Sequence, residues 1–147
     1  ALHWFATPAF FNQARRALKP NGLFCAWCYS LLEISAAVDA IIHRLYYETL
    51  AGCWPAGRSS VDAGYRDIQP PFPRIEPPPF ALEAHWDLRE LMGYLRSWSA
   101  TGRYQAAQGV NPVLAFEQAI SSAWGDAERG RLVSWPLSLR VGRASGG

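Results

Sequence analysis

The sequence is poor in charge and almost without lysine, which argues against several classes of protein. Charged residues make up 18% of the 147 residues, the formal net charge is +2, and Lys19 is the single lysine. The arginines are scattered rather than gathered in a block, so we interpret them as solvated residues and expect no nucleic-acid partner. Because half of the residues are hydrophobic, the sequence predicts a packed core rather than a disordered chain.

Cysteines are few, and long apolar runs are missing. Three cysteines, an odd number, are typical of a reducing compartment rather than of a disulfide scaffold. No apolar run reaches the length of about 20 residues that spans a bilayer, and the start of the chain does not resemble a signal peptide. We therefore expect a soluble, cytoplasmic protein with no membrane partner. Since Ala1 replaces the usual methionine, we expect a sequence that begins inside a longer gene product or is processed.

Motifs for catalysis or metal binding are also missing. No Ser-His-Asp order, phosphate-binding glycine loop or carboxylate pair stands out. Cys25 and Cys28 have CxxC spacing, but in a strand residues three apart point to opposite faces, whereas redox pairs lie at helix starts. A zinc site would need a loose grouping of Cys53 with His43 or His85. We expect buried, inert cysteines and no metal.

The amino-terminal part of the chain has a helix-turn-strand pattern. Thr7 can cap a helix whose apolar residues recur at helical spacing as far as Leu18, and Gly22 follows its end. Leu23–Tyr29 is a nearly continuous apolar run, typical of a strand buried on both faces. Such an order is typical of an open, parallel α/β sheet, in which ligands bind at the carboxyl ends of the strands.

Apolar residues at helical spacing predict three more helices. The first begins at Ser35 and ends near Gly52. The second begins at Asp87, which forms a capping-box pattern with Glu90. The third begins at Asn111, and its predicted core positions are Leu114, Phe116, Ile120 and Trp124.

Two strands, a loop and a tail complete the predicted elements. Residues 80–86 and 134–141 alternate apolar and polar side chains, which predicts half-exposed strands. Residues 54–79 are rich in proline, glycine and serine and predict a Pro-rich surface loop. Residues 143–147 are predicted to be a frayed tail.

Three segments of the sequence resemble class I S-adenosylmethionine-dependent methyltransferases. They are ALHWF at Ala1–Phe5, RRALKPNGLFCAW at Arg15–Trp27 and SWPLSLRVGR at Ser134–Arg143. The sequence is most similar to the small-molecule branch related to trans-aconitate methyltransferases, and YLRSWSATGRY at Tyr94–Tyr104 resembles the cap region of that family. The L-K-P-x-G element is widely shared among these enzymes, so it indicates the superfamily and not the substrate.

The resemblance implies an α/β fold in which residues 1–147 form one partial domain. This would be the carboxyl half of a Rossmann-like sheet, with one parallel strand, an antiparallel pair and flanking helices. The glycine-rich turn and the acidic residue that are the family's main contacts to S-adenosylmethionine are not in this sequence. The resemblance thus implies a truncated methyltransferase for a small molecule, inactive alone, with weak or no cofactor binding.

Candidate site residues also follow from the resemblance. His3, Trp4 and Phe5 are implied as cofactor-binding residues, since aromatic faces attract a sulfonium cation. The alternative is that Trp4 and Phe5 only pack the next helix onto the sheet. Ala6 stands where the family commonly has Asp, so any role of that acid is lost. Tyr29, which ends the central strand, is implied either as a substrate-binding residue or as an ordinary core tyrosine.

Three residues of the cap-like segment are candidates for a substrate lid. They are Trp98, Arg103 and Tyr104, of which Arg103 suits a carboxylate because a guanidinium binds that group through two parallel hydrogen bonds. Helix packing and a solvated arginine are the alternative interpretation. No residue is assigned a catalytic role.

Two other classes of function fit the sequence. An exposed apolar edge of a sheet invites association, so the chain could be a non-catalytic module, derived from the methyltransferase fold, that forms a homodimer through this edge. The cysteines leave a thiol or metal protein as a third interpretation.

Overall fold

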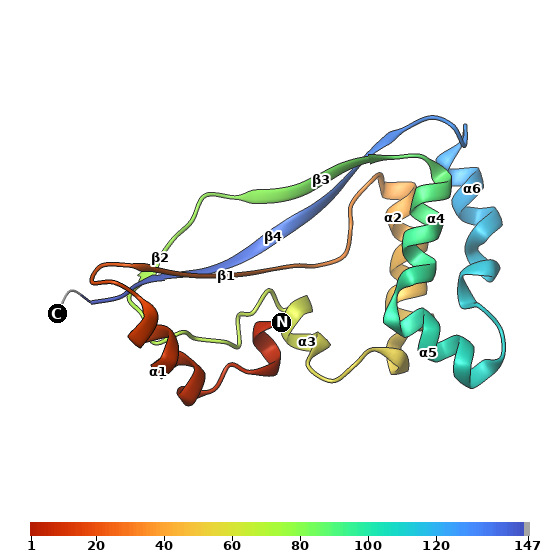
Figure 1. Cartoon of the computed structure of the whole chain (residues 1–147). Helices are drawn as coiled ribbons and strands as arrows, with labels where there is room; N and C mark the ends of the chain where they lie inside the picture. Colours follow the sequence, from red (N-terminus) through yellow and green to blue (C-terminus); the bar gives the residue numbers. More distant parts are fainter. Residues whose placement is uncertain (146–147) are drawn as a thin grey trace. The chain divides into compact units, whose positions relative to one another are not determined.

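The computed structural model describes residues 1–145 of the chain (Figure 1). Contacts divide these residues into two compact units. Unit 1 consists of Ala1–Leu31, Gly57–Leu82 and the chain from Trp135 onward, and unit 2 consists of Leu32–Ala56 and Glu83–Ser134. The chain passes between the units several times, and each unit has its own buried side chains.

Four strands form an open, antiparallel sheet. They are β1 (Leu23–Tyr29), β2 (Arg74–Ile75), β3 (Phe80–Trp86) and β4 (Arg131–Arg143), in the order β1-β4-β2, with β3 also paired to β4. The α/β class and the strands at 23–29 and 80–86 are confirmed, and β4 extends the predicted strand at both ends. Within residues 1–145, however, β1 does not pair as a parallel strand, because its neighbour β4 runs in the opposite direction.

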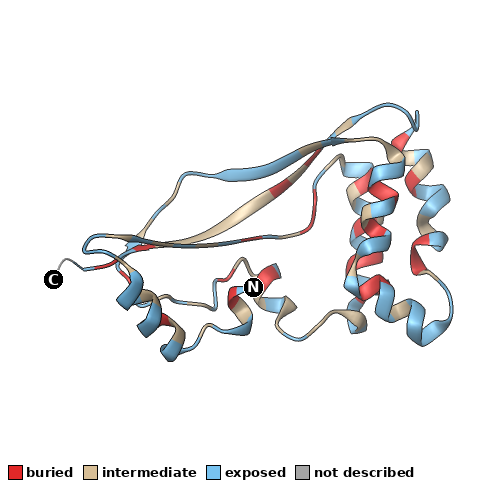
Figure 2. Ribbon diagram, in the orientation of Figure 1, coloured by how far each residue is buried: buried red, intermediate tan, exposed pale blue. Residues whose placement is uncertain are grey.

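Strand β1 is covered on one face, and the prediction of burial on both faces is wrong. Leu23, Trp27 and Tyr29 are 53%, 61% and 44% exposed, whereas Cys28 is buried. Exposed residues are frequent on β3 as well (Figure 2). Side chains alternate between the faces of a strand, so the odd-numbered residues share the uncovered side. The apolar run therefore identifies the strand and not the burial of its two faces.

One helix and one irregular segment supply the core on the covered face of β1. Helix α1 (Pro8–Ala17) begins as predicted, because the Thr7 hydroxyl accepts a hydrogen bond from the Phe10 amide at 3.2 Å. Its Phe11 packs in one cluster with a short 3-10 helix, η1 (Leu2–Trp4), and with side chains of the segment that follows residue 57. The cluster consists of Leu2, Phe11, Cys28, Val61, Tyr65 and Phe72.

The predicted Pro-rich loop at 54–79 contains regular structure. It includes helix α3 (Arg58–Asp62) and β2, and three of the cluster residues belong to it. The beginning of the predicted frayed tail is also held in place. Arg143 and Ala144 donate backbone hydrogen bonds to Pro73 and Gly22 at 3.0 and 2.8 Å, while positions 146 and 147 lie outside the described residues.

Unit 2 is built mainly from helices. They are α2 (Ala36–His43), the π-helix η2 (Arg44–Thr49), η3 (Ala51–Cys53), α4 (Leu88–Ser97), α5 (Ser99–Gln108), η4 (Pro112–Phe116) and α6 (Glu117–Trp124). The predicted capping box is confirmed: the Asp87 carboxylate accepts from the Glu90 amide at 2.8 Å, and the Glu90 carboxylate accepts from the Asp87 amide at 2.9 Å. Among residues 1–145 no helix combines the length and apolar character needed to cross a membrane.

The core of unit 2 confirms most of the predicted helical faces. Side chains without exposed surface include Val38, Ile42, Leu45, Leu91, Leu95, Ile120 and Trp124. Leu114 is 54% exposed, so its predicted core position is wrong. It lies in the 3-10 helix η4, whose three residues per turn point Val113 inward and Leu114 outward.

Candidate functional site

The three predicted cofactor-binding residues lie together at η1 in unit 1. Trp4 is 70% exposed and Phe5 is 42% exposed, so neither residue is part of the core. The Phe5 ring also packs edge-on against Phe10 of α1, with centroids 4.8 Å apart. Phe5 therefore has the packing role of the alternative interpretation. The Trp4 ring also makes an edge-on contact, with His3 at 4.8 Å between centroids, but Trp4 is the more exposed of the two residues.

The His3 side chain is held in place by its neighbours. Its Nδ1 lies 3.1 Å from the hydroxyl of Tyr65, a residue that is buried. Burial lowers the pKa of His3, which favours the neutral imidazole near pH 7. A Cβ added at Gly57 would come within 2.9 Å of Cδ2 of the imidazole, so this glycine makes room for the ring. The imidazole of His3, the middle residue of η1, therefore has a fixed position.

The predicted substrate-binding residues are divided between the two units. Tyr29 ends β1 in unit 1 and has no interaction with η1 among the described contacts, and its 44% exposure rules out an ordinary core position. Trp98, Arg103 and Tyr104 belong to unit 2, where α5 carries Arg103 as an exposed residue and Tyr104 as a half-buried one.

Trp98 belongs to an aromatic cluster that the sequence did not predict as a group. Its ring lies 5.5 Å from Tyr46, 5.6 Å from Trp54 and 5.8 Å from Tyr94, measured between centroids. Tyr46 lies in the π-helix η2 and is 1% exposed. These rings come from segments that are distant in the sequence, and π-helical turns are frequent at functional sites. The Trp98 side chain is therefore packed among other aromatic rings of unit 2.

The two cysteines of the CxxC pair point to opposite sides, as predicted. Cys28 is buried with its Sγ 3.8 Å from the Val61 carbonyl oxygen, and burial raises the pKa of its thiol. Cys25 is exposed, so the expectation that it is buried is wrong, for the same reason that applies to Trp27 on the uncovered face. In the part of the chain that the structure describes, no three His, Cys, Asp or Glu side chains are placed to hold a metal.

This geometry predicts unequal thiol reactivity. In the folded protein, iodoacetamide is expected to modify Cys25 on the order of tenfold or more faster than Cys28, because Cys28 is shielded and less of it is thiolate. Peptide mass spectrometry at timed intervals measures both rates in one sample. In urea the two rates should converge, and equal rates in the folded protein would contradict the structure.

Comparisons with known proteins point to methyltransferases. No protein-family model matches the chain. A Dictyostelium discoideum protein provisionally named a methyltransferase is 29% identical over 127 residues, which cover 84% of this chain and 48% of that protein. A solved structure from Anaeromyxobacter dehalogenans, described as a provisionally assigned type II methyltransferase, matches with a TM-score of 0.93 and 37% identity. That match covers 99% of this chain and 62% of the other.

The two relatives point to the same family, and the solved structure also supports the fold. Both are named methyltransferases, which supports a methyltransferase family for this chain, and the structural match supports its α/β fold. The chain spans about half the length of the curated relative and under two thirds of the structural one.

Proposed function

We propose that residues 1–147 form the carboxyl-terminal part of a cytoplasmic, S-adenosylmethionine-dependent methyltransferase that acts on a small molecule of the kind used by the trans-aconitate branch. The observation that carries this proposal is the structural match, with 37% identity over 99% of this chain to a protein named a methyltransferase. The unequal coverage supports a portion of a larger domain, because much of each relative has no counterpart in these residues. Three free cysteines support the reducing compartment.

The residues of η1 fit one side of the cofactor. S-Adenosylmethionine supplies an electrophilic methyl group on a sulfonium, and an aromatic face attracts such a cation by about 0.5–2 kcal/mol. Trp4 and Phe5 would provide that face, and the neutral His3 beside them adds no positive charge. The glycine-rich turn and the acidic residue expected from the resemblance are not in the sequence. These residues therefore supply a wall of the cofactor site and not its anchors.

The remaining site residues would act on the methyl acceptor. Methyl transfer from a sulfonium requires alignment of the acceptor oxygen and exclusion of water more than it requires a catalytic acid. Following the resemblance, we assign Tyr29 of unit 1 and, separately, Trp98, Arg103 and Tyr104 of unit 2 to substrate binding, with the exposed Arg103 suited to a carboxylate.

Calorimetry with S-adenosylmethionine tests the proposal. Residues 1–147 alone are expected to bind it in the millimolar range or not at all, because the cofactor's anchors are absent. The gene product that contains this sequence is expected to bind it with micromolar affinity. Micromolar binding by residues 1–147 would contradict the proposal that they hold only part of the cofactor site. If the gene product that contains this sequence did not bind S-adenosylmethionine, the proposed methyltransferase function would be wrong.

A dimerising module derived from the same fold is the second candidate. Strand β1 lies at an edge of the described sheet and exposes Trp27, and such an edge can pair with a strand of another copy. The names of both relatives favour the enzyme over this module.

A further inference from the structure

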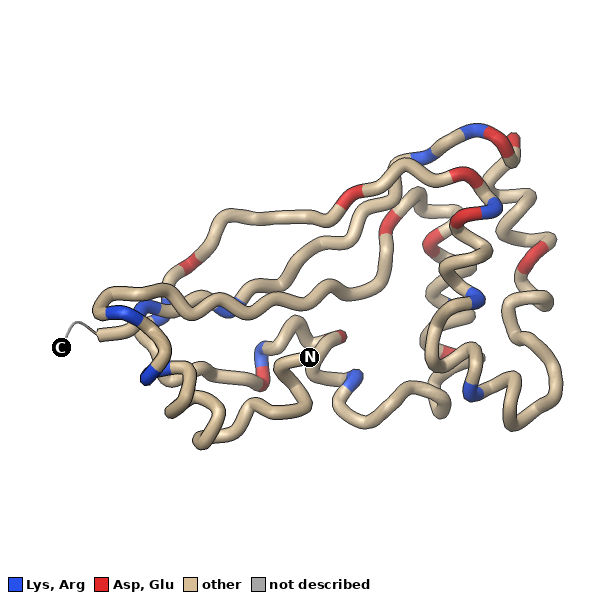
Figure 3. Tube along the Cα trace, in the orientation of Figure 1, with Lys and Arg blue, Asp and Glu red and all other residues tan. Residues whose placement is uncertain are grey.

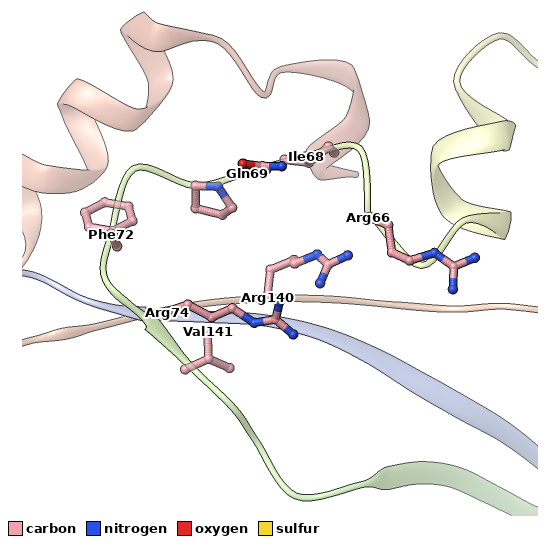
Figure 4. A pocket seen from close by; sticks show the side chains of 8 residues that line it. Arg66, Ile68, Gln69, Phe72, Arg74, Arg140 and Val141 are labelled. Atoms are coloured by element: carbon pink, nitrogen blue, oxygen red, sulfur yellow. The ribbon is translucent and has the colours of Figure 1, made fainter.

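Unit 1 contains a cavity with three arginines in its lining. Its volume is about 570 Å³, and Arg66, Arg74 and Arg140 contribute to its wall together with Gln69 (Figure 4). A neighbouring hollow of about 370 Å³ is lined by the same three arginines. The three arginines thus line both spaces, and the larger space has the size typical of small-molecule sites, about 300–1,000 Å³.

Strand pairing explains how two of these arginines meet. Arg74 of β2 lies directly opposite Gly142 of β4, and Arg140 lies two residues before Gly142 on the same strand. Residues opposite each other share a face, as do residues two apart, so Arg74 and Arg140 project from the same side of the sheet. Gly142 has no side chain, and Phe72, another residue of the cavity lining, packs against it at that position. Arg66 reaches the cavity from the segment after α3.

The Arg140 side chain is oriented by an unusual piece of backbone. Its Nε donates a hydrogen bond of 2.7 Å to the carbonyl oxygen of Tyr65. Tyr65 has a φ of +56°, a left-handed conformation that is uncommon for residues other than glycine, and its side chain is buried. This backbone holds one edge of the Arg140 guanidinium and leaves its terminal nitrogens without a hydrogen-bond partner among the described residues.

The positive charge around the cavity is only partly compensated. Arg74 forms an ion pair of 2.7 Å with Glu76, but both side chains are largely exposed, at 69% and 76%, so the pair is weak. Over residues 1–145, the side chains of Arg66 and Arg140 form no ion pair. Figure 3 shows how the fold gathers basic residues near the end of the sheet that holds β2, although they are scattered in the sequence.

We infer that this cavity binds a small phosphate ester, with its phosphate among Arg66, Arg74 and Arg140. Guanidinium groups form charge-assisted hydrogen bonds with both phosphate and carboxylate. Three guanidiniums from three separate segments suit the three oxygens of a phosphate better than the two in-plane oxygens of a carboxylate. The apolar side chains of Ile68 and Phe72 in the same lining would contact the organic part. The inference rests on unit 1 alone and does not depend on methyl transfer.

Calorimetric titrations at constant ionic strength test this inference on residues 1–147. Phenyl phosphate, inorganic phosphate and benzoate are the probes. Phenyl phosphate is expected to bind about tenfold or more tightly than either of the others, because only it combines the phosphate with an apolar group. If benzoate bound as tightly as phenyl phosphate, the cavity would have no preference for phosphate over carboxylate. If inorganic phosphate bound as tightly as phenyl phosphate, the organic part of the ester would contribute nothing to binding.

Variants locate the binding. Arg66→Gln is expected to weaken phenyl phosphate binding about tenfold. The Arg66 side chain has no hydrogen bond or ion pair over residues 1–145, so its replacement should leave the fold intact, which circular dichroism checks. Arg74→Gln should have a similar effect. The matched control is Arg16→Gln on α1, which removes the same charge from a residue that bonds Gln13 outside the lining. Equal affinities of Arg66→Gln and Arg16→Gln would overturn the site.

Discussion

Replacing Trp124 by alanine is expected to lower the free energy of unfolding of unit 2 by about 3–5 kcal/mol, the usual loss for a fully buried large aromatic side chain. Trp124 ends α6 and has no exposed surface. Its indole N–H donates to the Arg129 carbonyl at 3.2 Å, and the Arg131 guanidinium lies over the ring, 5.3 Å from the centroid. The substitution leaves a cavity and removes both of these contacts.

Urea unfolding followed by circular dichroism measures this loss. Leu114→Ala is the matched control, because Leu114 is an apolar residue of the same unit that is 54% exposed, and it should change stability by no more than about 0.5 kcal/mol. If Trp124→Ala lowered stability by no more than Leu114→Ala did, the packing described for α6 would be wrong.

Features set by neighbours in the sequence could be predicted. The capping box needs only Asp87 and Glu90, three positions apart, and the start of α1 needs only Thr7 and the amides after it. The bounds of β1 also followed from its own seven residues, since the turn before it and the apolar run are local signals.

Burial could not be predicted in the same way, because it depends on what lies across from a residue. The apolar character of β1 suggested two covered faces, yet its odd-numbered side chains have no cover, and Cys25 is exposed with them. Leu114 differs for a local reason: the 3-10 turn changes the angle between successive side chains. A hydrophobic pattern thus identifies an element before it identifies the faces that are buried.

Neighbours in the sequence can indicate a site, whereas residues that strand pairing brings together cannot be found in that way. His3, Trp4 and Phe5 are adjacent in the sequence, so a short motif could indicate them as candidates, and their role stays a prediction. Arg74 and Arg140 are brought together only by the register of β2 against β4, which the sequence did not predict, and they were therefore interpreted as solvated. Tyr46 and Trp54 are likewise far from Trp98 in the sequence, so no local pattern predicted their contacts with its ring.

The Gly142→Ala substitution tests that register directly, and it is expected to destabilise unit 1 by about 1–3 kcal/mol. A Cβ at position 142 would lie 2.6 Å from Cβ of Phe72 and 3.1 Å from its carbonyl oxygen. Phe72 cannot easily retreat, because its ring stacks on Phe24 with centroids 5.1 Å apart. The hydrogen bond of 3.0 Å from the Arg143 amide to the Pro73 carbonyl fixes the adjoining backbone.

Gly102→Ala is the control for this prediction, because it makes the same glycine-to-alanine change at a position where the added Cβ meets no clash. Gly102 lies in α5 with no atom within 4 Å of an added Cβ, and alanine favours helices over glycine by about 1 kcal/mol. Gly102→Ala is therefore expected to raise the midpoint of thermal unfolding, whereas Gly142→Ala lowers it. If the Gly142→Ala protein were as stable as the parent, Phe72 would not lie over β4. The description of Phe72 as part of the arginine-lined cavity would then also be wrong.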